Sequence, residues 1–110
     1  MKSVDQVSRG VAGFFDDEIR PSLSSGKGIL YGIAVGRIMA NMPNLIAQYA
    51  PILSPLGIVK DGMIDAEGLA TELRNQMARS GGTLSVRIMG DEFIFKPQDV
   101  DALMRHIERA

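Results

Sequence analysis

Few residues in this chain have a type and spacing that could carry out chemistry. The most concentrated are the three consecutive acids Asp16, Asp17 and Glu18, and the single histidine, His106. Paired carboxylates can act as acid and base or hold Mg²⁺, but neighbouring positions on a helix point their side chains in diverging directions. A histidine without a placed nucleophile or second ligand is a weak catalytic candidate. We therefore interpret the acids as a solvated helix face and place His106 on an exposed helix flank.

Two short stretches are similar to ligand-binding loops but lack essential residues. The Ser-Ser-Gly-Lys-Gly loop at residues 24–28 has neither the leading glycine nor the final Ser or Thr of a phosphate-binding loop, and it follows a helix. Residues 61–67 match the middle of an EF-hand, but Gly57, Val59 and Gly68 stand where carboxylates belong. The chain has no cysteine, which excludes disulfides and thiolate sites. We predict no catalytic residue, no cofactor and no metal, and hence a protein that is not an enzyme.

The functional prediction rests on small residues at four-residue spacing in a nearly uncharged segment. Residues 28–59 carry one charge, that of Arg37. Small residues at this spacing let another backbone approach closely, either inside the subunit or in a partner, and the pattern fits both about equally. So much uncharged surface favours an interface, most simply in a symmetric dimer. The candidate interface residues are Gly28, Gly32, Gly36, Ala40, Ile33 and Met39.

Bulk composition narrows the class of protein further. A chain of 110 residues is one domain of ordinary size. With 12 basic and 13 acidic side chains it lacks the positive patch or tail of a nucleic-acid-binding protein. Its first residues include an acid where a signal peptide has its apolar run, so we expect a cytoplasmic protein. Residues 28–42 alone are too short to span a bilayer. The expected partner is a second copy or another protein, rather than nucleic acid or a membrane.

Apolar periodicity predicts a single α+β domain, residues 1–110, with four to five helices. The first half, residues 1–57, is helical and rich in apolar residues. A helix runs from Ser3, its N-cap, to Arg20, although Gly10 and Gly13 weaken it. Two short apolar helices then join at Met42-Pro43.

The second half, residues 58–110, reads as hairpin, helix, hairpin and helix. Asp61-Gly62 is a typical two-residue hairpin turn, and Asp65 caps a helix over residues 66–79 that ends at Ser80-Gly81-Gly82.

The C-terminal hairpin turns at Gly90-Asp91, which pairs Ile88 with Phe93 and places Val86 opposite Phe95. An amphipathic helix then begins at Pro97. Its apolar stripe covers the hairpin or another helix and consists of Val100, Leu103, Met104 and Ile107.

Two stretches, residues 42–51 (MPNLIAQYAP) and residues 90–95 with 99–103 (GDEFIF and DVDAL), cover about a fifth of the chain. In them the chain resembles a family of small uncharacterised proteins encoded by Gram-positive bacteria and their prophages. The resemblance implies no activity, but it favours a phage-related or accessory role.

The leading hypothesis is therefore a non-enzymatic, self-associating interaction or structural module. One alternative is a membrane-associated protein in which residues 28–59 insert as a helical hairpin. Another is a nucleic-acid-binding regulator whose arginines gather on one side after folding, namely Arg74, Arg79, Arg87, Arg105 and Arg109.

Overall fold

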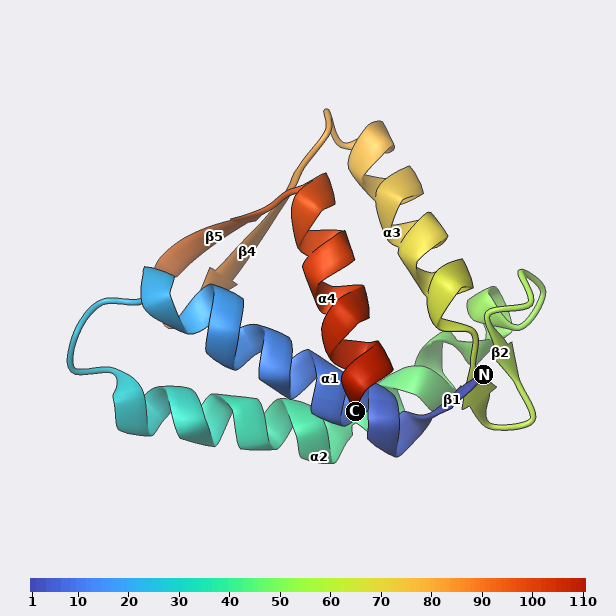
Figure 1. The fold of residues 1–110 in the computed structure, drawn as a ribbon, viewed down its shortest axis with the longest axis horizontal. Coiled ribbons are helices and arrows are strands. Elements are labelled where there is room, and N and C mark those ends of the chain that lie inside the picture. The colour runs from blue at the N-terminus through green and yellow to red at the C-terminus, as the bar shows by residue number, and fades with distance from the viewer.

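A computed structural model describes all 110 residues and confirms the α+β class (Figure 1). It contains four α-helices, and the predicted C-terminal hairpin leads directly into the last of them. The helices are α1 (Val4–Phe14), α2 (Gly28–Leu53), α3 (Ala66–Arg79) and α4 (Pro97–Arg109). The strands of the hairpin are β4 (Leu84–Ile88) and β5 (Asp91–Phe95).

The first helix begins where the sequence predicts. The Ser3 hydroxyl accepts a hydrogen bond from the backbone N–H of Gln6 at 3.1 Å, and the Gln6 side chain accepts one from the Ser3 N–H at 3.0 Å. This capping box satisfies two of the free amides at the helix start. Beyond Phe14 the helical path continues as a π turn over Phe15–Ile19 and a 3₁₀ turn over Arg20–Ser22.

A small three-stranded sheet joins the chain's start to its middle. Strands β2 (Val59–Lys60) and β3 (Met63–Ile64) form the predicted hairpin, with φ angles of 53° at Asp61 and 74° at Gly62. Both central residues of the favoured hairpin turn need positive φ. The apparent EF-hand segment is this turn and the helix start after it. Strand β1 (Lys2–Ser3) adds to β3, giving the order β1-β3-β2, and the sequence analysis missed it.

The prediction of two helices joined at Met42-Pro43 is wrong, because α2 is one continuous 26-residue helix that contains Pro43 and Pro51. Each proline leaves a carbonyl one turn earlier without its hydrogen bond, which ordinarily bends or breaks a helix. Both prolines are exposed. Water can therefore reach the carbonyls of Met39 and Ala47, so that the lost bonds are replaced and the helix continues.

Helix α3 has the predicted bounds. It follows Asp65, whose side chain makes no capping bond. It ends at glycines with positive φ, and the Gly82 N–H donates to the Met77 carbonyl at 2.7 Å. This bond satisfies one of the last free carbonyls of the helix.

The hairpin of β4 and β5 has the predicted face but not the predicted register. The turn is at Met89-Gly90, so that Val86 pairs with Phe93 and Ile88 pairs with Asp91. The predicted register was wrong by two residues. Because side chains alternate with a period of two, a two-residue shift keeps the same residues on the inner face. Both turn residues adopt positive φ, as a two-residue hairpin turn requires.

The core lies where α4 crosses α1 and α3. Val100 and Ile107 of α4 have no exposed surface. The hairpin joins this core through Phe95, whose ring meets the ring of Phe14 edge to face at a centroid distance of 5.7 Å. The predicted stripe of α4 therefore packs mainly on helices, and the hairpin covers one end of the same core.

Gly10 explains how α1 and α4 come so close. A Cβ built on Gly10 would lie 2.5 Å from the Cα of Ile107, and one on Gly13 would lie 3.1 Å from Nδ1 of His106. These glycines allow the two helix backbones to touch. Their effect on the fold is therefore the opposite of the weakening that helix propensity alone indicates.

Candidate interaction surface

Helix α2 packs one side against the protein and leaves the other side uncovered. Its buried residues are Tyr31 and Met42, and Ile46 packs against the core. On the opposite side Ile29 is 83% exposed and Ile33 is 50% exposed. Figure 1 shows α2 along one edge of the molecule, with α1 beside it.

Five of the six predicted interface residues are exposed, and only Met39 is half-buried. A Cβ at Gly28, Gly32 or Gly36 would meet no atom within 4 Å. The glycines thus make no close contact within the subunit. This removes the alternative that the small residues at four-residue spacing pack inside their own chain.

The exposed residues of α2 also follow a spacing that differs from the constant four-residue spacing of the predicted small residues. Positions four apart drift round an α-helix by about 40° per step. Steps that alternate between four and three residues stay on one side, as in coiled coils. Six exposed residues with this alternation form what we call the outer seam, namely Ile29, Ile33, Gly36, Ala40, Pro43 and Ala47.

Sequence reasoning missed half of the outer seam. Ile29, Pro43 and Ala47 were not among the predicted interface residues. The alternating spacing is readable in the sequence, but the first apolar helix was expected to end at Met42, and the pattern is too short to recognise within it. The signal becomes clear only when α2 is known to continue to Leu53.

A polar strip runs beside the outer seam on the exposed side of α2. By length and composition α2 is the one helix that could cross a membrane, so the argument from a short helix over residues 28–42 no longer holds. However, Arg37, Asn41, Asn44 and Gln48 are all exposed on this strip. Lipid would leave these polar groups without partners, which is costly. A protein surface or water suits them better.

The Ser-Ser-Gly-Lys-Gly loop does bind an anion, and the anion belongs to the same chain. The carboxylate of Asp91 accepts hydrogen bonds from the Ser24 N–H at 3.0 Å and from the Lys27 ammonium at 3.1 Å. The same ammonium donates to the Met89 carbonyl at 2.6 Å. The backbone bond from Ser24, followed by the Lys27 bond, lowers the pKa of Asp91 below its ordinary 3.8. The loop thereby ties the start of α2 to the hairpin turn.

Replacing Asp91 with asparagine should reduce the acid sensitivity of the fold. A carboxyl with a lowered folded-state pKa stabilises the fold above its unfolded-state value of 3.8, and that stability disappears as the pH falls through the lower folded-state value. The free energy of unfolding should therefore fall more steeply below pH 3.8 in the wild type than in Asp91→Asn. Urea unfolding over this pH range measures the difference. Parallel pH profiles would show that the Asp91 contacts do not stabilise the fold.

Tyr31 carries a buried hydroxyl that makes no hydrogen bond. The side chain is 2% exposed, and the Arg20 guanidinium lies 5.5 Å from the ring centroid, within cation–π range. Burial, with a smaller contribution from Asp16, raises the pKa of Tyr31 to about 12.

Replacing Tyr31 with phenylalanine should leave the protein at least as stable at neutral pH, because the change removes a buried polar group that has no partner. Above pH 10 the phenol ionises in the unfolded chain, whereas in the folded chain it stays protonated up to a pKa of about 12. The wild type should therefore lose stability relative to Tyr31→Phe between these two values. Denaturant unfolding at neutral and alkaline pH measures this. An equal alkaline loss in both proteins would contradict the assigned burial.

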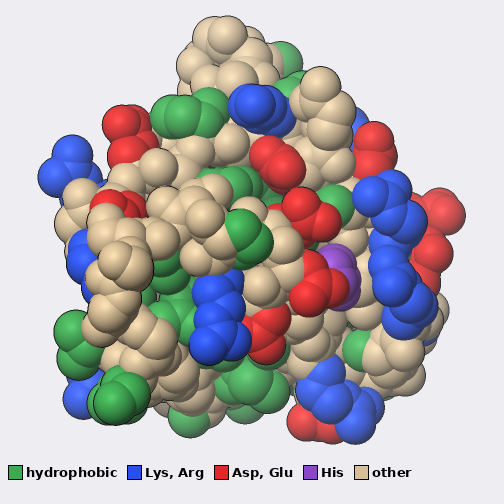
Figure 2. Space-filling view, turned by 60° about the vertical axis from the view of Figure 1, so that its left-hand side comes forward, with side chains coloured by type: hydrophobic (Ala, Val, Ile, Leu, Met, Phe, Trp, Pro, Cys, Tyr) green, Lys and Arg blue, Asp and Glu red, His purple; other side chains and the backbone are tan.

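His106 is not on an exposed flank, which corrects the prediction. Its side chain is 13% exposed, and its Nε2 lies 3.4 Å from Oδ2 of Asp17. Phe14 packs edge to face against the ring at a centroid distance of 6.3 Å. Figure 2 shows the histidine beside acidic side chains. No group of three or more His, Asp or Glu side chains comes together as a metal site requires.

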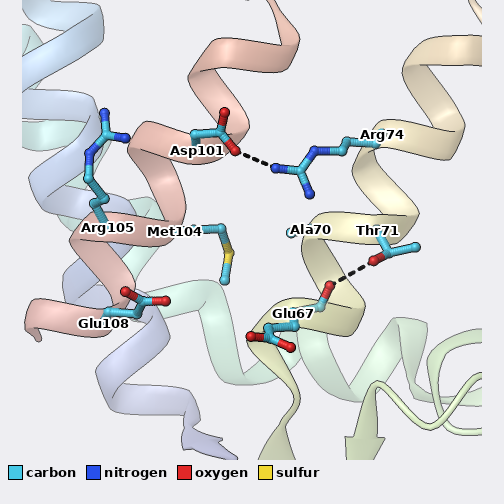
Figure 3. A pocket seen from close by; sticks show the side chains of 8 residues that line it. All are labelled: Glu67, Ala70, Thr71, Arg74, Asp101, Met104, Arg105 and Glu108. Carbon is cyan, nitrogen blue, oxygen red and sulfur yellow. Dashed lines mark hydrogen bonds and ion pairs between the residues drawn. The ribbon is translucent and has the colours of Figure 1, made fainter.

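A polar cavity of about 560 Å³ opens between α3 and α4 (Figure 3). Arg74 of α3 reaches across to form an ion pair with Asp101 of α4. The Thr71 hydroxyl donates to the carbonyl of Glu67 at 3.0 Å, and the Met104 side chain points between the two helices. The cavity wall carries both basic and acidic side chains. Two of them, Arg74 and Asp101, already pair with each other.

Three of the five arginines that a nucleic-acid regulator would use lie next to acidic side chains, whereas Arg105 and Arg109 lie one turn apart on α4. Arg74 is held in the ion pair just described. Arg79 lies 3.9 Å from Glu72, and Arg87 faces Glu92 across the β4–β5 ladder. On the face shown in Figure 2, Lys and Arg side chains are interspersed with Asp and Glu. The geometry therefore does not favour this alternative.

Comparison of the chain with protein-family models, curated proteins and solved structures gives no match. The resemblance to small proteins of Gram-positive bacteria and prophages therefore stays a prediction.

Proposed function

We propose that this protein is a non-enzymatic interaction module that forms a symmetric dimer through the outer seam of α2. The observation that carries the proposal is the seam itself, which is exposed, free of charge and spaced for helix–helix packing along most of a 26-residue helix. A phage-related or accessory setting belongs to the same proposal and rests on the family resemblance alone.

The total accessible surface area of the chain supports the proposal that a partner covers part of it. A folded monomer of 11.9 kDa is expected to expose about 5,950 Å². This chain exposes 6537 Å², an excess of about 600 Å². A standard stable interface buries about 800 Å² on each partner. The excess is about three quarters of that area.

The side chains of the outer seam suit a second copy of the same helix. Gly36, Ala40 and Ala47 let two backbones approach closely, while Ile29 and Ile33 supply apolar bulk. A twofold axis requires the same patch on both partners.

The single charge of α2 favours an antiparallel pair. Two parallel copies would place their Arg37 side chains next to each other. An antiparallel pair with Ala40 near the axis places each Arg37 opposite Pro43 of the other copy. This orientation also aligns the two helix dipoles favourably.

Light scattering on the purified protein at tens of micromolar tests the proposal. The expected mass is twice the 11.9 kDa of one chain. It should change little with salt, because the outer seam carries no charge. A mass of one chain over this concentration range would contradict the proposal.

A further inference from the structure

A second apolar feature lies on the inner side of α2 and is independent of the outer seam. Helix α3 packs against α4 but stands away from α1 and α2. The space between them is a cavity of about 450 Å³, which we call the apolar trench. Residues from all three helices line it, including Val7, Val11, Leu45, Ile46, Leu69 and Leu73.

A second apolar cavity lies next to the trench, against the C-terminal hairpin. This cavity of about 210 Å³ shares Val11 and Leu73 with the trench and extends to Phe14 and Phe95. All residues that line this second cavity are apolar. The two cavities lie next to each other along α1, with Val11 and Leu73 in the wall of both.

The only acid in the wall of the trench is already engaged. Glu72 accepts a hydrogen bond from the Gln76 amide at 3.2 Å and lies 3.9 Å from Arg79. Glu72 and Gln76 contribute only their aliphatic stems to the lining. No Lys or Arg lines the trench. A charged ligand would therefore find no partner there.

The volume of the trench and its apolar wall decide which class of uncharged molecule fits it. An extended peptide would bring N–H and C=O groups into a wall that offers no hydrogen-bond partner. A small hydrocarbon-like molecule has no such polar groups and needs no hydrogen-bond partner in the wall. Cavities of 300–1,000 Å³ with apolar walls are typical of sites for such molecules.

We propose that the apolar trench is a binding site for an uncharged, hydrocarbon-like small molecule, held between α1, α2 and α3. Burial of its apolar surface drives binding. The outer seam faces away from the trench, so the site is open in the monomer and in the proposed dimer.

The uncharged dye N-phenyl-1-naphthylamine tests the site through its fluorescence, which rises in apolar surroundings. Wild-type protein should bind it saturably, with one dye per chain. Leu45→Gln should weaken binding at least tenfold, because it places an amide in the wall. Leu45 lies outside the buried core cluster, so the unfolding midpoint of this variant should stay close to that of the wild type.

Two controls separate this proposal from the dimer. Ile29→Gln changes the outer side of α2 and should leave dye binding unchanged. Ile33→Glu, which places a charge in the outer seam to prevent dimerisation, should bind the dye as the wild type does, so failure of the dimer proposal does not affect this test. Non-saturable binding, equal binding to Leu45→Gln, or loss of binding as protein concentration rises would overturn the assignment. The last result would show that a second copy covers the trench.

Discussion

Replacing Gly10 with alanine is expected to destabilise the fold by about 3 kcal/mol. The new methyl group would lie 2.5 Å from the Cα and 2.8 Å from the backbone nitrogen of Ile107. Backbone atoms cannot rotate away as a side chain can, so α1 and α4 must move apart. Because these helices form the main contact of the core, the strain spreads to Val100 and the rest of the buried stripe. The gain of about 1 kcal/mol in helix propensity does not offset this loss.

Chemical and thermal unfolding of Gly10→Ala and Gly32→Ala measure the effect. A loss of about 3 kcal/mol lowers the melting temperature by roughly 10–20 °C in a domain of this size. Gly32 is the matched control, since it is also inside a helix but has no atom within 4 Å of the added Cβ. That variant should gain up to about 1 kcal/mol. Equal stabilities of the two variants would show that α1 and α4 are not in close contact.

Replacing Ile33 with glutamate is expected to weaken the dimer at least a hundredfold. Ile33 is half exposed in the single chain and belongs to the outer seam, so the carboxylate is well solvated in the monomer. On association the twofold axis buries two such charges in a seam that offers no countercharge. The cost is several kcal/mol for each buried ion, which exceeds the about 2.7 kcal/mol that corresponds to a hundredfold loss.

Sedimentation equilibrium of Ile33→Glu and Ile94→Glu gives the dissociation constants. Ile94 is 41% exposed on the hairpin and lies outside α2, so Ile94→Glu should remain a dimer. Circular dichroism should show the same helix content in both variants. Dissociation by both substitutions to the same extent would indicate that general charge, rather than the outer seam, controls association.

Local sequence signals predicted most of the second half of the fold. The Asp61-Gly62 turn, the bounds of α3 and the inner face of the C-terminal hairpin all follow from short-range patterns. The hairpin register was wrong because Gly90 can occupy either central position of a two-residue turn. In the observed register, with its turn at Met89-Gly90, Asp91 accepts hydrogen bonds from Ser24 and Lys27. That contact spans more than sixty residues, and no local pattern reports it.

The first half shows where local rules are overridden. Pro43 and Pro51 predict helix ends, but exposed positions let water replace the lost hydrogen bonds. Spacing drew attention to the small residues of α2, whereas the glycines that two helices need for close approach are Gly10 and Gly13. Which helix packs against a given glycine depends on the tertiary structure and cannot be predicted from local spacing. The small residues therefore pointed to the helix that has an uncovered side, but the outer seam could be defined only once that side of α2 was known.

Cross-linking through a single introduced cysteine tests the central proposal most directly. The chain has no native cysteine, so Ala40→Cys provides one thiol near the middle of the outer seam, and Ile94→Cys provides a matched thiol on the hairpin. With a short bifunctional maleimide, Ala40→Cys should form covalent dimers in high yield and Ile94→Cys should not. Absence of cross-linked dimer from Ala40→Cys, or equal yields from the two variants, would contradict a dimer built on the outer seam of α2.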